Sequence, residues 1–256
     1  MAINESLNPD FLSRCPVQDG FRQRGAEMTR IEVLTDTAFA FAVTMLVISL
    51  NDLPRTWQEL LDGVRQLPAL IASFAQIMMF WYGHVKWSRR FGLEDSTTIC
   101  LSAVLIFVTL VFVYFLRLLF SSAFAWATDG YLPSELEIES VAHVRWLFIL
   151  YGAGFLLLSG VLGLLNAHAL RLRAKLSLDA LEIHETRVEI LASIVLAATA
   201  SISILLAIVL DGPWLSLAGI VYATLGITLT ILGIEGARRR PAAVPADGNA
   251  AGAIAH

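Results

Sequence analysis

The sequence places a few polar and charged side chains within long apolar runs, where each is a candidate for function. Asp36 is the only charge inside the first such run, and Arg30 lies about two helical turns before it. In the next run, Trp81 and His84 are three residues apart and therefore share one face of a helix. A carboxylate, a guanidinium, an indole N–H and an imidazole at similar depth, with the Thr35 hydroxyl beside them, can form one hydrogen-bonded cluster.

Two interpretations of this cluster remain open at the level of the sequence. Intramembrane carboxylate and histidine groups build proton relays, which would make Asp36 and His84 the centre of a proton-coupled secondary transporter. The same residue types are also common as interfacial anchors and helix caps near the ends of membrane helices.

Enzyme chemistry is not expected, because the sequence contains no H-E-x-x-H, no P-loop and no nucleophile elbow. Cys15 and Cys100 lie far apart and have neither disulfide-framework nor metal-site spacing. We therefore expect no cofactor and no resident metal.

A second pattern follows the first apolar run. Thr37, Phe41, Thr44 and Ile48 recur at spacings of four, three and four, which places them on one stripe of a helix, with Met45 at its side. Around a pore, Phe41 and Ile48 would form apolar constrictions with a layer of Thr44 hydroxyls between them. The alternative is ordinary helix packing in which each threonine hydroxyl bonds back to its own backbone.

Glycines form a third pattern near the end of the chain. Gly212, Gly219, Gly226 and Gly233 recur every seven residues. Small residues at such spacing let helices approach closely, so this pattern predicts helix packing.

The composition indicates the kind of element that must position these groups. The 256 residues are 57% hydrophobic and 16% charged, with a mean hydropathy of +0.69. Soluble domains are about 45–50% apolar and about 25% charged, so a soluble enzyme, a disordered chain and a nucleic-acid binder are all unexpected. The net charge of −4 gives no sign of a polyanionic partner. The fold class predicted is an all-α integral membrane protein.

Six apolar runs are long enough to cross a bilayer, which needs about 20 residues each. These runs are residues 33–50, 67–85, 98–120, 146–170, 190–210 and 214–234. They divide the chain into an N-terminal segment 1–29, a six-helix channel-forming region 30–236 and a disordered tail 237–256. We expect residues 1–25 to be loosely ordered, 54–65 to form a separate surface helix, and the charged connector 171–189 to be solvated.

Loop charges orient the chain in the membrane. Fourteen of the 18 Lys and Arg residues lie on the side that holds both termini, so both termini are predicted to be cytoplasmic. The opposite side carries an acidic loop with Glu135, Glu137 and Glu139. This loop either concentrates cations at an outer mouth or is only solvated surface.

The first apolar run resembles the first helix of the transmembrane protein 175 family, which comprises endosomal and lysosomal potassium channels with bacterial relatives. In the family pattern R-x-x-x-F-S-D, Arg30, Leu34, Thr35 and Asp36 occupy the four named places. Thr44 matches a family threonine that follows a small and apolar run. Trp81 and His84 match the family's W-x-x-H in the second helix.

This resemblance implies a homotetrameric, potassium-preferring cation channel in the cell membrane, with the lipid bilayer as its other partner and no nucleic acid. Potassium would be the permeant ion rather than a cofactor, and the first helix of each copy would line the pore. Phe41 would occupy the place of the constricting aliphatic residue, while Arg30, Thr35, Asp36, Trp81 and His84 would brace the pore helix. Leu34 and Thr35 depart from the family's Phe and Ser, and the Phe41 rings would narrow the pore or rotate aside.

Overall fold

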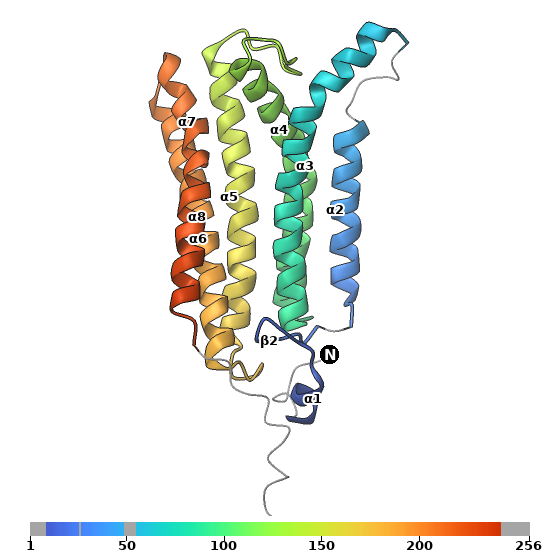
Figure 1. The fold of residues 1–256 in the computed structure, drawn as a ribbon, viewed down its shortest axis with the longest axis vertical. Helices are drawn as coiled ribbons and strands as arrows, with labels where there is room; N and C mark the ends of the chain where they lie inside the picture. Colours follow the sequence, from blue (N-terminus) through green and yellow to red (C-terminus); the bar gives the residue numbers. More distant parts are fainter. Residues whose placement is uncertain (1–8, 26, 49–54, 242–256) are drawn as a thin grey trace, which may run out of the picture.

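The computed structural model describes residues 9–25, 27–48 and 55–241. Six helical passages run alternately in opposite directions through one bundle (Figure 1). The first five are α2 (Arg30–Ile48), α3 (Trp57–Phe91), α4 (Ser96–Ala127), α5 (Val141–Arg171) and α6 (Ala180–Val209). The sixth passage consists of η1 (Gly212–Ser216), α7 (Leu217–Ile220), η2 (Val221–Ala223) and α8 (Thr224–Arg238). The predicted all-α class is confirmed.

Five of these passages are long and apolar enough to cross a bilayer. They are α2, α4, α5, α6 and the sixth passage Gly212–Arg238. Among the described helices of similar length, α3 falls outside this set, because Gln76 and His84 lower the hydropathy of its charge-free middle and charged residues occupy both of its ends. Its apolar middle is correspondingly shorter than that of its neighbours.

α3 differs from the prediction in one respect. The expected surface helix and the expected second span form a single helix of 35 residues that continues through Pro68. A capping box begins it, in which the Thr56 hydroxyl accepts from the Glu59 N–H at 3.2 Å and the Glu59 carboxylate accepts from the Thr56 N–H at 3.3 Å. Proline removes one backbone donor and bends a helix rather than always ending it. The upper part of α3 leans away from the rest in Figure 1.

The N-terminal segment is folded from Pro9 onward, which corrects the expectation that it is loosely ordered. α1 (Pro9–Arg14) precedes a hairpin of β1 (Val17–Gln18) and β2 (Phe21–Arg22) that lies across the lower end of the bundle (Figure 1). Phe21 is 1% exposed and contacts the edge of the Phe91 ring, with ring centroids 5.6 Å apart. Burial of this aromatic side chain holds the hairpin against α3.

The charged connector between α5 and α6 is also not simply solvated. Glu182, in the first turn of α6, is fully buried and accepts hydrogen bonds from the Arg24 guanidinium at 2.7 and 3.0 Å. Arg24 Nε donates to the Leu176 carbonyl at 3.0 Å. Arg24 therefore links the N-terminal hairpin to this connector, and its charge is paired inside the protein.

The core of the bundle contains a group of aromatic rings. Phe80 of α3 contacts Phe112 of α4 and Phe155 of α5 edge to face, and Tyr151 packs beside Phe112 and Phe155. No residue of α8 is buried, so the sixth passage lies at the periphery of the described chain.

Candidate functional site

α2 packs against its own chain with one face only. Its buried residues are Glu32, Thr35, Phe39, Ala42 and Leu46. The predicted stripe lies on the opposite face of the helix, where all four residues are exposed: Thr37, Phe41, Thr44 and Ile48. The exposed fractions of Phe41 and Ile48 are 52% and 68%, and that of Met45 at the edge of the stripe is 42%. The stripe therefore does not serve packing within the chain.

The two threonine hydroxyls of the stripe bond back to their own helix. Thr37 donates to the Val33 carbonyl at 2.8 Å, and Thr44 donates to the Ala40 carbonyl at 2.9 Å. This bonding uses only the hydroxyl hydrogen, so the oxygen lone pairs remain available as acceptors. The Thr44 hydroxyl thus bonds to its own helix, as in ordinary helix packing, and still presents an acceptor oxygen on the exposed face.

The predicted bracing cluster forms in part. The Trp81 indole N–H of α3 donates to Asp36 Oδ1 at 2.9 Å, which joins the two helices at the deepest charge of α2. His84 lies one turn further along α3 but points to α4, where its Nε2 is 3.4 Å from Ser102 Oγ. Its Nδ1 has no hydrogen-bond partner within the described part of the chain.

The other two members of the predicted cluster lie apart from Asp36. Thr35 is buried, and its hydroxyl donates to the Ile31 carbonyl of its own helix at 2.7 Å. Arg30 is exposed at the start of α2, where it borders a shallow depression with Leu34. The structure therefore brings Asp36 and Trp81 together and leaves Arg30 outside this contact.

Glu32 is a bracing residue that the sequence patterns did not identify. It is 1% exposed and accepts hydrogen bonds from Ser88 Oγ at 3.0 Å and from Arg89 Nε at 3.2 Å. A charge-assisted bond to a buried carboxylate is stronger than a neutral one. The first turn of α2 is therefore fixed to the last turn of α3. In the sequence, the only sign of this contact was the group of basic residues after the second apolar run, which could pair with an acidic residue of α2.

Arg117 holds the other end of α2. It is 4% exposed, lies in α4, and donates to the Leu46 carbonyl in the last turn of α2. It also binds Gln66 Oε1 at 3.2 Å and forms an ion pair with Glu135. A cation at a helix C-terminus complements the unpaired carbonyls there. Glu135 of the acidic loop is thus engaged in bracing the bundle.

Acidic and imidazole groups do not converge elsewhere in a way that would hold a metal. Within residues 9–25, 27–48 and 55–241, no group of three or more His, Cys, Asp or Glu side chains is positioned as a metal site. The arrangement can therefore hold a helix in a fixed rotation and present apolar and hydroxyl groups along it.

Comparison with known proteins gives the class of this fold: a membrane-embedded potassium channel family. Residues 30–113 match the family model described as endosomal/lysosomal potassium channel TMEM175. A relative from Marivirga tractuosa named potassium channel is 31% identical over 199 residues, which are 76% of this chain and 79% of the relative. The chain belongs to the TMEM175 potassium channel family, which confirms the resemblance seen in the sequence.

Solved structures agree with this assignment. One is the potassium channel MtTMEM175, crystallised as a threonine-to-alanine variant with a nanobody–MBP fusion. It is 26% identical to this chain, and the two structures superpose with a TM-score of 0.74, covering 87% of this chain and 99% of that one. A lysosomal potassium-selective channel TMEM175 homolog from Chamaesiphon minutus shares the fold at 19% identity, with a TM-score of 0.53 over 81% of this chain and 96% of that one. A potassium channel family is not an enzyme class, and these relatives do not favour a transporter.

Proposed function

We propose that four copies of this chain form a potassium-preferring cation channel whose pore is lined by α2. The observation that carries the proposal is the exposure of Thr37, Phe41, Thr44 and Ile48 on the face of α2 opposite its buried face. One chain supplies one such helix, and a closed pore needs several copies around an axis. Membership of a potassium channel family supports the same arrangement.

In this proposal the stripe forms successive layers along the ion path. Four Phe41 rings and four Ile48 side chains form apolar constrictions, and Thr44 supplies a layer of hydroxyl oxygens between them. An ion crossing an apolar constriction sheds part of its water, and K⁺ gives up water more easily than the smaller Na⁺. Passage is passive, and closure follows when the Phe41 rings turn into the path and the constriction dewets.

The contacts behind α2 set its rotation about its own axis. Trp81 holds Asp36, Arg89 holds Glu32, and Arg117 holds the last turn. A rotation of α2 by one residue would carry the stripe off the pore axis, so we assign these residues a positioning role. In this proposal Arg30 and His84 do not contact the ion, because Arg30 lies at the start of α2 and His84 lies between α3 and α4.

We further propose that all six passages, including α3, cross the cell membrane with both termini in the cytoplasm. The first passage begins and the last one ends at the same end of the bundle (Figure 1). The basic groups of α3's last turn, of the connector near Arg171 and of the turn after Arg238 gather at that end. This distribution follows the positive-inside rule. Residues 242–256 of the expected tail lie outside the described residues.

Potassium flux into liposomes reconstituted with the purified full-length protein tests the proposal. Phe41→Ala should raise the flux, and Thr44→Ala should change the ratio of potassium to sodium flux. Phe107→Ala is the matched control, because Phe107 is 68% exposed but lies on α4. Its flux should equal that of the unmodified chain.

Absence of cation flux from well-folded protein, with Phe41→Ala equally silent, would contradict the proposal. Saturable, proton-coupled uptake that Asp36→Asn abolishes would contradict it in favour of a transporter.

A further inference from the structure

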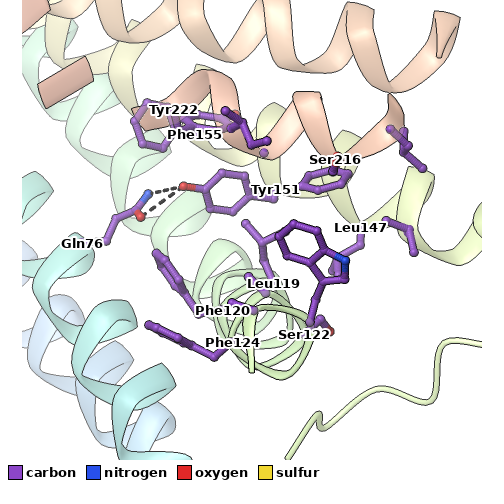
Figure 2. A pocket seen from close by; sticks show the side chains of 18 of the residues that line it. Gln76, Leu119, Phe120, Ser122, Phe124, Leu147, Tyr151, Phe155, Ser216 and Tyr222 are labelled. Carbon is purple, nitrogen blue, oxygen red and sulfur yellow. Dashed lines mark hydrogen bonds between the residues drawn. The ribbon is translucent and has the colours of Figure 1, made fainter. Parts of the chain in front are cut away.

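A large cavity opens into the bundle at the end opposite the N-terminal hairpin. Its volume is about 1390 Å³, and its walls come from α3, α4, α5 and the sixth passage (Figure 2). Typical small-ligand pockets measure about 300–1,000 Å³. Two of its lining side chains, Gln76 and Tyr151, hydrogen-bond to each other at 2.8 and 3.1 Å (Figure 2).

The lining is mostly apolar and carries no charge. Leu119, Leu147, Phe155 and Leu225 are typical of it, and no Asp, Glu, Lys or Arg of the described chain belongs to it. A cavity with such walls gives water too few partners and stays dry or takes an apolar guest. An ion or a charged metabolite is excluded for the same reason.

Tryptophans mark the depth of this cavity in the membrane. Trp57, Trp126, Trp146 and Trp214 are 61–71% exposed, and each lies near a helix end on the same side of the bundle as the cavity. Exposed tryptophans concentrate at the boundary between headgroups and hydrocarbon. Trp126 itself lines the cavity, so the cavity begins at this boundary and extends inward from it.

The cavity is longer than the hydrocarbon of one leaflet is deep, so it has room for an acyl chain along its whole length. Along the sixth passage its lining extends from Gly212 to Thr230, a rise of about 27 Å at about 1.5 Å per residue. A leaflet contributes half of the hydrocarbon core, roughly 15 Å. Ser122 and Ser134, whose hydroxyls are 3.3 Å apart, lie among the lining residues of α4 and the loop after it. They give this part of the lining a polar patch, beside which an ester linkage can lie.

We propose that this cavity binds an acyl chain of a phospholipid drawn from the leaflet on the tryptophan side. The ester region lies by Ser122 and Ser134, and the hydrocarbon extends along α8 toward Thr230. The bound acyl chain fills the apolar space between α3 and the sixth passage, which protein side chains leave open.

Two glycines of the sixth passage provide a matched pair for the test. Gly226 lines the cavity, and a Cβ atom built on it has no atom within 4 Å. Gly233 is equally open but lies outside the lining. Gly219, by contrast, would bring its Cβ within 3.0 Å of Phe148, so of these three only Gly219 makes the close contact that the glycine pattern predicted.

Photo-crosslinking in vesicles tests the proposal. The full-length protein is reconstituted into phosphatidylcholine and phosphatidylglycerol vesicles that contain phosphatidylcholine with a diazirine in one acyl chain. Adducts on Leu147, Tyr151 and Phe155 are expected, because these side chains are at most 6% exposed and line the cavity. Gly226→Phe should lower this labelling about tenfold, which corresponds to about 1.4 kcal/mol of lost affinity. Gly233→Phe should leave it unchanged.

Other outcomes would overturn the proposal. One is labelling confined to outward residues such as Ile227 and Ile231. Another is equal labelling of the Gly226→Phe and Gly233→Phe variants, and a third is crosslinking between two copies of the protein at the cavity. Labelling by a diazirine fatty acid but not by the phospholipid would also contradict the assignment. Elution from a size-exclusion column at the same volume as the unmodified protein establishes that a variant is folded. If Gly226→Phe is not folded, Gly226→Leu takes its place.

Discussion

The buried pair of Arg24 and Glu182 makes the folded N-terminal hairpin testable. Their side chains are 1% and 0% exposed, and they meet at 2.7 Å. Arg24→Met removes this cation and leaves the Glu182 carboxylate buried. The nearest remaining cation is the Arg22 guanidinium at 3.7 Å, and the backbone N–H groups of Arg22 and Asp179 still donate to the carboxylate at 3.0 and 3.1 Å. Removing one partner of a buried pair costs about 3–5 kcal/mol, because the remaining charge is desolvated without compensation.

This cost should be visible in the melting temperature of the purified protein. For a chain of this size, 1 kcal/mol shifts the midpoint by about 2–4 °C, so Arg24→Met should lower it by roughly 10 °C. The double variant Arg24→Met/Glu182→Leu should lose less than the sum of the two single changes, because no unpaired charge remains.

An exposed ion pair provides the control. Glu235 of α8 and Arg239, which caps the end of α8, are 45% and 74% exposed and lie four residues apart. Exposed pairs contribute about 0–1 kcal/mol, so Arg239→Met should leave the midpoint nearly unchanged. If Arg24→Met were equally silent, or if the two single changes were additive, the hairpin would not be anchored as described.

Two further predictions concern the same end of the bundle. Gly25→Ala would place a Cβ 2.4 Å from the Ser88 carbonyl oxygen, and should lower the melting midpoint by several degrees because a backbone atom has to shift; an unchanged midpoint would contradict the close approach. Burial raises the pKa of Asp95, but the Thr98 hydroxyl at 2.7 Å and His168 at 2.8 Å outweigh it and hold that pKa below 3.8. This lowered pKa stabilises the fold at every pH above the ordinary carboxyl value, and the benefit is lost as the pH falls from that value through the lowered pKa of Asp95. The advantage over Asp95→Asn in thermal melts should therefore be full at neutral pH and be lost only in acid below the ordinary carboxyl value; a constant difference from neutral to acid pH would refute the contribution.

The course of the chain through the bundle was predictable because it depends on hydropathy. Each apolar run coincides with a helical passage, since backbone groups in hydrocarbon must be bonded within the helix. The predicted break between the surface helix 54–65 and the run 67–85 does not occur, because a proline such as Pro68 can bend a long helix without ending it. The folding of residues 9–25 was not predictable, because Arg24 gains its stability from Glu182, more than 150 residues away.

The candidate pore helix shows the same division between local and distant information. The stripe through Phe41 and Thr44 follows from helical spacing alone, and the structure places it on the free face. The contact of Asp36 with Trp81 was expected from a motif shared with a family. The roles of Glu32 and Arg117 depend on which helices pack beside α2, and spacing within one helix carries no such information.

Accessibility of Thr44 in the open channel is the most direct measurement of whether α2 lines the ion path. In a background with Cys15→Ser and Cys100→Ser, Ag⁺ should block potassium flux through Thr44→Cys. The matched variant Ala42→Cys, on the buried face of the same helix, should conduct in the presence of Ag⁺. Block of Ala42→Cys with Thr44→Cys unaffected, or unblocked flux through both, would show that ions take a path other than the exposed face of α2.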